Sequence, residues 1–138
     1  MKRKKVFLDS DVIISSLISD KGAAYFIIHE TDLQSFVSNK SIEELEQVCD
    51  RLGLNKDKLA EVVKEKLNVV QLKEVKKSFK NYTLDLDDVH IIAGVKKAKA
   101  KYLLSYNTKD FKIDKIIQEL KIVVTTPARF LQYLRSLQ

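Results

Sequence analysis

Residues 6–11 read VFLDSD, an apolar run of three residues followed directly by Asp9, Ser10 and Asp11. A continuous apolar run, without alternation of apolar and polar residues, is typical of a strand that is covered on both faces. Further runs of this character predict strands at residues 35–38, 68–72, 101–105 and 121–125. The sequence therefore predicts a sheet of about five strands, buried on both sides.

Segments with helical periodicity lie among these runs. Their apolar residues recur every three or four positions in residues 41–52, 56–67, 85–98 and 127–137. The predicted apolar faces include Leu52 at the end of the first segment and Leu137 at the end of the last. Residues 73–82 carry no pattern that we assign. Strands alternating with helices predict an α/β fold with a mostly parallel sheet, and the absence of a linker or repeat favours one domain over residues 1–138.

The composition excludes several classes of protein. A single cysteine, Cys49, cannot form an internal disulfide, and one cysteine with two histidines is too few for a zinc finger. No apolar run approaches the roughly 20 residues of a membrane span, and the run at residues 6–8 is too short for a signal peptide. We therefore expect a cytoplasmic protein that holds any metal mainly through oxygen. The net charge of +6 favours a polyanionic partner.

Acidic and amide side chains gather at the predicted strand ends. The set consists of Asp9 and Asp11 after the first strand, Glu44 in the helix after the second, Asp85 and Asp88 at the start of the helix before the fourth, and Asn107 and Asp110 after the fourth. In open parallel sheets, ligands bind outside the carboxyl ends of the strands. Clustered carboxylates repel one another, and a divalent cation such as Mg²⁺ or Mn²⁺ relieves that repulsion.

Structural roles compete with this interpretation. Asp85 can cap a helix with Asp88 in its first turn, and Asn107 with Asp110 can cap a short helix. Glu44 alone is typical of an exposed helix position. Asp9 is harder to explain in this way, because a carboxylate directly after a buried strand is costly without a partner.

Five motifs in order resemble the PIN domain, the metal-dependent nuclease fold found in VapC-like toxin ribonucleases. They occupy residues 6–15, 41–48, 85–94, 103–111 and 122–131, and so extend over nearly the whole chain. The resemblance implies a single-domain, three-layer α/β/α fold around a mostly parallel sheet. It also implies hydrolysis of RNA phosphodiester bonds with Mg²⁺ or Mn²⁺, a cognate antitoxin protein and a homodimer.

The family's four acids correspond to particular residues of this chain. Catalytic and metal-binding roles carry over to Asp9, Glu44, Asp88 and Asp110, with Asp85, Asn107 and Asp11 as second-tier candidates. Asp11 stands where the family often has Asn, and Asn107 stands where many relatives have Asp. It stays open whether Asn107 or Asp110 lies nearer the metal. For His90 we expect a partly buried, hydrogen-bonded side chain rather than a metal ligand.

The basic residues form several clusters that could contact RNA. The group Lys73, Lys76, Lys77 and Lys80 and the basic run at residues 2–5 are the predicted contacts. A further group at residues 96–101 follows a helix and is expected at the opposite end of the sheet from the acids. Solvated helix faces would produce the same clusters.

Two other functions fit part of the pattern. Residues 6–12 superficially match the opening of haloacid-dehalogenase-type phosphatases, in which Asp9 would be the nucleophile. Against this, Asp87 and Asp88 precede a predicted helix, whereas the late acidic pair of such enzymes follows a strand. The second is a PIN-like module that binds RNA or protein with little catalysis. The four filled acid positions argue against it.

Overall fold

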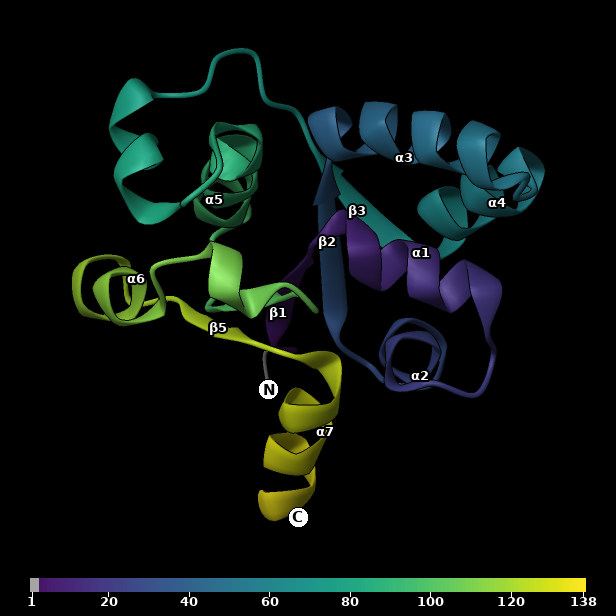
Figure 1. Cartoon of the computed structure of the whole chain (residues 1–138). Coiled ribbons are helices and arrows are strands. Elements are labelled where there is room, and N and C mark those ends of the chain that lie inside the picture. Colours follow the sequence, from purple (N-terminus) through teal and green to yellow (C-terminus); the bar gives the residue numbers. More distant parts are fainter. Residues whose placement is uncertain (1–2) are drawn as a thin grey trace.

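The computed structural model describes residues 3–138, and its centre is one sheet of five parallel strands. The strands are β1 (Lys5–Leu8), β2 (Gln34–Ser38), β3 (Leu67–Val70), β4 (Tyr102–Leu104) and β5 (Val123–Thr125), in the order β3-β2-β1-β4-β5 (Figure 1). All five predicted strands are present, and every pairing is parallel. The predicted α/β class and strand number are confirmed.

Helices cover both faces of the sheet. They are α1 (Ser10–Ile18), α2 (Ala23–His29), α3 (Asn39–Leu52), α4 (Lys56–Lys66), α5 (Val89–Ala98), α6 (Ile113–Leu120) and α7 (Pro127–Ser136), with short 3₁₀ turns η1 (Lys77–Tyr82), η2 (Leu86–Asp88) and η3 (Thr108–Asp110). The four predicted helices are confirmed, although the segment at 85–98 begins as η2. Our prediction did not include α1, α2 and α6, because these are short helices and the first two are too uniformly apolar to show a distinct face.

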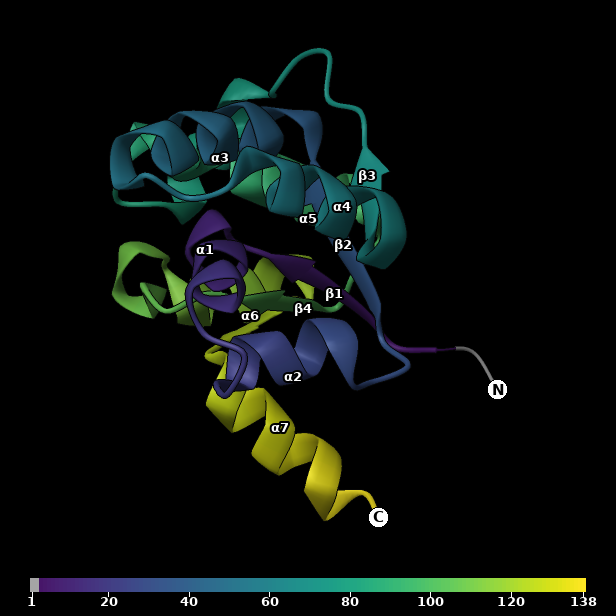
Figure 2. The same cartoon turned by 90° about the vertical axis from the view of Figure 1, so that its right-hand side faces the viewer.

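Two apolar clusters lie on opposite faces of the sheet. Val6 and Leu8 of β1 pack with α1, α2, α3, α4 and α7, whereas Phe7 points the other way and packs with α5 and α6. Figures 1 and 2 show the resulting three layers. Leu52 and Leu137 were expected on buried faces but are 56% and 57% exposed, because each lies at the end of its helix, beyond the edge of the core.

No single helix within residues 3–138 is long and apolar enough to cross a membrane. By length and composition alone, the pair α1 and α2 would pass such a test, but the two helices meet at a bend of 96°. Their apolar side chains, including Val12, Ile13 and Ile27, are buried in the cluster beneath the sheet. That packing accounts for their apolar composition.

The strand order reverses at β1, which places a crevice at one end of the sheet. The chain adds β2 and β3 on one side of β1 and then returns to add β4 and β5 on the other. Past the strand ends, the Asp9 N–H donates to the Leu104 carbonyl at 2.9 Å and the Ser105 N–H donates to the Thr125 carbonyl at 3.0 Å. The residues after β1, β4 and β5 are therefore held in register at the position where such folds bind ligands.

Candidate active site

Asp9 leaves the end of β1 and caps the start of α1. Its carboxylate accepts hydrogen bonds from the Ser10 N–H and the Ser105 hydroxyl, both at 2.8 Å. Burial nevertheless raises the pKa of Asp9 above its usual value; the two hydrogen bonds oppose this rise, and the Glu44 charge adds to it. The protein thus holds a carboxylate in a fixed orientation at a site that disfavours its charge.

Asp11 connects α1 to the loop after β4. Its Oδ2 accepts hydrogen bonds from the Tyr106 N–H at 3.1 Å and from the Asn107 side-chain amide at 3.0 Å. Its Oδ1 is buried without a partner. Burial, followed by the charge of Asp9, raises the pKa of Asp11 to about 6. Asn107 is thereby engaged with Asp11.

Asp88 ends η2 and directly precedes α5. Burial, followed by the charges of Asp9, Asp85 and Asp110 in that order, raises its pKa to about 6. Charges repel one another appreciably only at short range, so these three carboxylates lie near that of Asp88. Asp110 is therefore the residue after β4 whose charge acts on Asp88.

Asp85 has a capping role in the structure. Its carboxylate accepts a hydrogen bond from the Asp87 N–H at 2.9 Å and so starts η2. The capping alternative weighed for this residue is therefore confirmed. Because η2 ends at Asp88, the cap also determines where the Asp88 backbone lies relative to the sheet.

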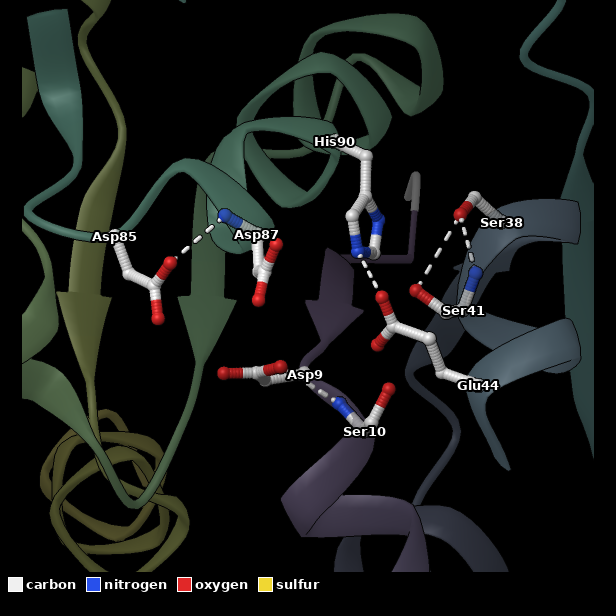
Figure 3. Close-up of polar contacts among 8 residues, drawn as sticks. All are labelled: Asp9, Ser10, Ser38, Ser41, Glu44, Asp85, Asp87 and His90. Atoms are coloured by element: carbon white, nitrogen blue, oxygen red, sulfur yellow. Dashed lines mark hydrogen bonds and ion pairs between the residues drawn. The ribbon is translucent and has the colours of Figure 1, made fainter. Parts of the chain in front are cut away.

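Glu44 comes from α3 and contacts His90 of α5. Its Oε1 lies 2.6 Å from His90 Nε2, with the His90 side chain 13% exposed and that of Glu44 47% exposed. The expected partly buried, hydrogen-bonded His90 is confirmed. Figure 3 shows Asp9 between Asp85 on one side and the Glu44–His90 pair on the other. Glu44 thus lies on the other side of Asp9 from Asp85.

A groove of about 760 Å³ lies between α3 and the start of α5. Lys40, Glu44 and Arg51 line it from α3, and Asp88 and His90 line it from the α5 side. The groove therefore combines the positive charges of Lys40 and Arg51 with the carboxylates of Glu44, Asp87 and Asp88.

The sequence model of the PIN domain family matches residues 5–109. The chain belongs to the PIN-domain family. This match spans most of the sequence and includes Asp9, Glu44 and Asp88, whereas Asp110 lies one residue beyond it. A search of curated proteins found no match.

PIN domains are in general nucleases that use divalent metal ions. Membership therefore supports a nuclease-type hydrolase, and it removes the basis for the phosphatase alternative with Asp9 as nucleophile. The structure agrees, because Asp88 stands at the start of a helix rather than at the end of a strand. Cys49 is fully buried in the core and offers no accessible thiol.

The donor set of this PIN domain fits a hard divalent cation. All candidate donors are oxygens, the pKa values of Asp9, Asp11 and Asp88 are raised in ways that a nearby cation would reverse, and Asp11 Oδ1 lacks a partner. Within residues 3–138, no three His, Cys, Asp or Glu side chains are already placed to hold a metal ion together. Metal binding would therefore require these carboxylates to turn toward one another.

Sequence reasoning missed one residue of this site, Ser105. Its hydroxyl donates to Asp9, and its own Oγ accepts from the Asn107 N–H at 3.0 Å. A signal was present, since Ser105 directly follows a buried strand, as Asp9 does. What was lacking was the register that pairs Leu8 with Leu104 and so places the next two residues side by side.

Proposed function

We propose that this PIN domain is a metal-dependent endoribonuclease that hydrolyses phosphodiester bonds in RNA. The observation that carries the proposal is that acids from separate parts of the chain meet beyond the strand ends, namely Asp9 after β1, Asp88 before α5 and Glu44 on α3. In keeping with this, burial and the charges of Asp9, Asp85 and Asp110 raise the pKa of Asp88 to about 6. A fold that keeps four like charges together forgoes stability, which a cation restores.

Each acidic residue of the site has a particular role in this proposal. Asp9 and Asp88 hold Mg²⁺ or Mn²⁺, and Asp110 and Glu44 complete the metal's surroundings or orient the attacking water. When bound, the metal supplies a lowered pKa for that water and offsets the charge that develops on the phosphate. Ser105 keeps Asp9 in place through its 2.8 Å hydrogen bond, and His90 keeps Glu44 in place.

RNA enters along the groove between α3 and α5 in this proposal. Lys40 and Arg51 line the groove and would contact phosphates. The predicted RNA contacts Lys73, Lys76, Lys77 and Lys80 are exposed on the segment that follows β3. That segment reaches the groove through Val75, which lines it. It follows the carboxyl end of β3, the same end of the sheet as the carboxylates.

The test is cleavage of a panel of structured and unstructured RNAs in Mg²⁺, Mn²⁺ or EDTA. We expect metal-dependent cleavage that Asp88→Asn reduces on the order of a hundredfold or more, the contribution of a positioned catalytic group. Asp20→Asn is the matched control, because Asp20 is exposed between α1 and α2 and does not line the groove. In the same samples, metal should raise the thermal midpoint of the wild type and have a smaller effect on Asp88→Asn.

The opposite results favour the binding-module alternative. If the folded wild type cleaves none of the RNAs and no metal raises its thermal midpoint, the nuclease proposal fails. Cleavage that persists in EDTA would contradict the proposed role of the metal. Equal reductions in Asp20→Asn and Asp88→Asn would contradict the proposed role of Asp88.

We further propose that the protein is a toxin and that a cognate antitoxin inhibits it. A basic side chain of an inhibitor would be attracted to the carboxylates of Asp88 and Glu44 in the groove. Leu84 and Leu86, at 69% and 74% exposed, offer apolar contact beside it. We expect induced wild-type protein to arrest growth of its host and Asp88→Asn not to. Co-production of the protein encoded next to its gene should relieve the arrest and inhibit cleavage in vitro.

A homodimer is supported by a second groove, which is largely apolar and lies between α2 and α7. It measures about 750 Å³ and is lined by Phe26, Leu131, Leu134 and Leu137, with Glu30, Asp32 and Arg135 among the charged residues around it. Charges of both signs beside one apolar patch suit a self-complementary contact. Light scattering should give a dimer for the wild type and a monomer for Phe26→Lys, and a monomeric wild type would contradict the proposal.

A further inference from the structure

A basic cavity of about 890 Å³ lies at the amino ends of the strands, opposite the carboxylates. Five cations line it, from the start of β1 and from the turn before β4: Arg3, Lys4, Lys5, Lys99 and Lys101. No aspartate or glutamate of the described chain, residues 3–138, lines this cavity. Like charges around one cavity repel one another, so an anion bound there gains from all five.

Two tyrosines form one wall of this cavity. Tyr102 of β4 and Tyr133 of α7 are joined by a 3.3 Å hydrogen bond between their hydroxyls. Lys4 Nζ lies 5.9 Å from the centre of the Tyr133 ring, and Tyr133 is 39% exposed. An accessible aromatic ring with a cation beside it suits a base and its phosphate.

A second cavity continues from the same two tyrosines. It measures about 360 Å³ and extends from Tyr102 and Tyr133 past Val123 to Thr125 and Arg129. The two cavities share Tyr102 and Tyr133 and are here together called the basic trough. Residues of the edge strand β5 and of the helix α7 line it, and Figure 1 shows these two elements. Its ends lie at opposite ends of the sheet.

Hydrogen bonds connect the far end of the basic trough to the candidate active site. The Thr125 carbonyl accepts the hydrogen bond of the Ser105 N–H at 3.0 Å, and the Ser105 hydroxyl donates to Asp9 at 2.8 Å. Thr125 is therefore two hydrogen bonds away from a carboxylate of the site. A chain that leaves the carboxylates along β5 meets Arg129, then the two tyrosines, then the five cations.

We propose that the basic trough binds a single-stranded segment of the RNA that the carboxylates cleave. Phosphates contact the cations of the trough, and bases stack on Tyr133. A duplex keeps its bases away from such a ring, so the ligand is single-stranded. The proposal rests on the proposed ribonuclease function, and it predicts that a long single strand binds more tightly than one that covers only the carboxylates.

The test measures binding separately from cleavage. Fluorescence anisotropy in EDTA would follow Asp88→Asn protein with labelled oligouridines of about 6 and about 20 nucleotides, which bracket common single-strand site sizes. Lys4→Gln/Lys101→Gln should weaken binding of the longer strand about tenfold. The slope of log affinity against log salt should fall by about 1.4, since each lost phosphate contact removes about 0.7. Lys64→Gln/Lys66→Gln, an equal charge change on exposed residues of α4, should change neither.

The aromatic contact has its own pair of variants. Tyr133→Leu should weaken binding of the longer strand about fivefold or more, whereas Tyr133→Phe, which keeps the ring, should bind as the parent protein does. Thermal midpoints verify that each variant is folded. Equal affinities for the Lys4/Lys101 and Lys64/Lys66 variants, or equal losses in Tyr133→Leu and Tyr133→Phe, would overturn the proposal.

Its failure is distinguishable from failure of the proposed function. If the wild type cleaves RNA with metal while the trough variants bind and cleave like the control, the trough has no role and the ribonuclease stands. If the trough variants lose binding as expected but the wild type never cleaves, the trough is an RNA site and the ribonuclease proposal fails.

Discussion

His90 Nε2 of α5 lies 2.6 Å from Glu44 Oε1 of α3, and this contact joins the two sides of the groove between these helices. A carboxylate only accepts, so the imidazole donates through Nε2. The other ring nitrogen, Nδ1, is buried without a partner. His90 therefore orients Glu44 through a single hydrogen bond.

Removing that hydrogen bond should slow RNA cleavage. We expect His90→Leu to lower kcat about tenfold, because a hydrogen bond to a charged group contributes about 1.5–3 kcal/mol and 1.4 kcal/mol is a factor of ten. His90→Gln keeps an N–H donor and should retain most of the activity. Steady-state cleavage kinetics, with urea unfolding of the same samples, check this. Two variants that differ in stability but not in kcat would assign His90 a purely structural role.

Asp88→Asn should stabilise the metal-free protein above pH 6. The pKa of Asp88 is raised from 3.8 to about 6, so between these values the folded state binds more protons than the unfolded state. The stability of the wild type therefore falls as pH rises through this window. Because Asp88 is partly exposed, solvent screens the repulsion and reduces its effect. We therefore expect the free energy of unfolding of the variant to exceed that of the wild type by about 1 kcal/mol at pH 7.

Urea unfolding in EDTA from pH 3.5 to pH 7.5 measures this difference. The two proteins should converge below about pH 4, where Asp88 is protonated in both states. An Asp88→Asn variant that is less stable than the wild type at pH 7 would mean that the other carboxylates do not repel Asp88.

Asp11 should matter for stability through the loop after β4. Asp11→Ala leaves the Tyr106 N–H and the Asn107 amide without their acceptor, and we expect a loss of about 1–3 kcal/mol in the free energy of unfolding. Asp11→Asn keeps an accepting oxygen and removes the repulsion from Asp9, so it should cost much less. Urea unfolding at pH 7 compares them, and equal losses would argue against the hydrogen bonds as the cause.

Gly94 is required by the packing of α5 on β1. A Cβ atom at this position would lie 2.4 Å from the ring of Phe7, which is fully buried and has no room to move. We expect Gly94→Ala to destabilise the protein by about 1–3 kcal/mol, in spite of the better helix propensity of alanine. Gly22→Ala, where nothing lies within 4 Å, is the control. Thermal unfolding that ranks the two variants equally would contradict this packing.

Much of the fold was predictable because its signals are local. Each strand is a short apolar run, and α3, α4, α5 and α7 have apolar residues on one face. The helices α1 and α2 escaped prediction because they are short and carry apolar residues on their exposed sides too, such as Ile18 and Phe26, which obscures the period. The acids were recognisable for a related reason, since a carboxylate such as Asp9 stands out when it directly follows three buried residues.

The partners of these acids were not predictable in the same way. Ser105 and Asp9 are separated by 96 residues and Glu44 and His90 by 46. The basic trough likewise joins Lys4 to Lys101 across β1 and β4. Such pairs depend on strand order and register, which come from the packing of the whole chain. Local patterns in the sequence thus determined the strands and the identity of the acids, whereas the tertiary structure alone decided which side chains hold them, because those contacts form only after the parallel strands align.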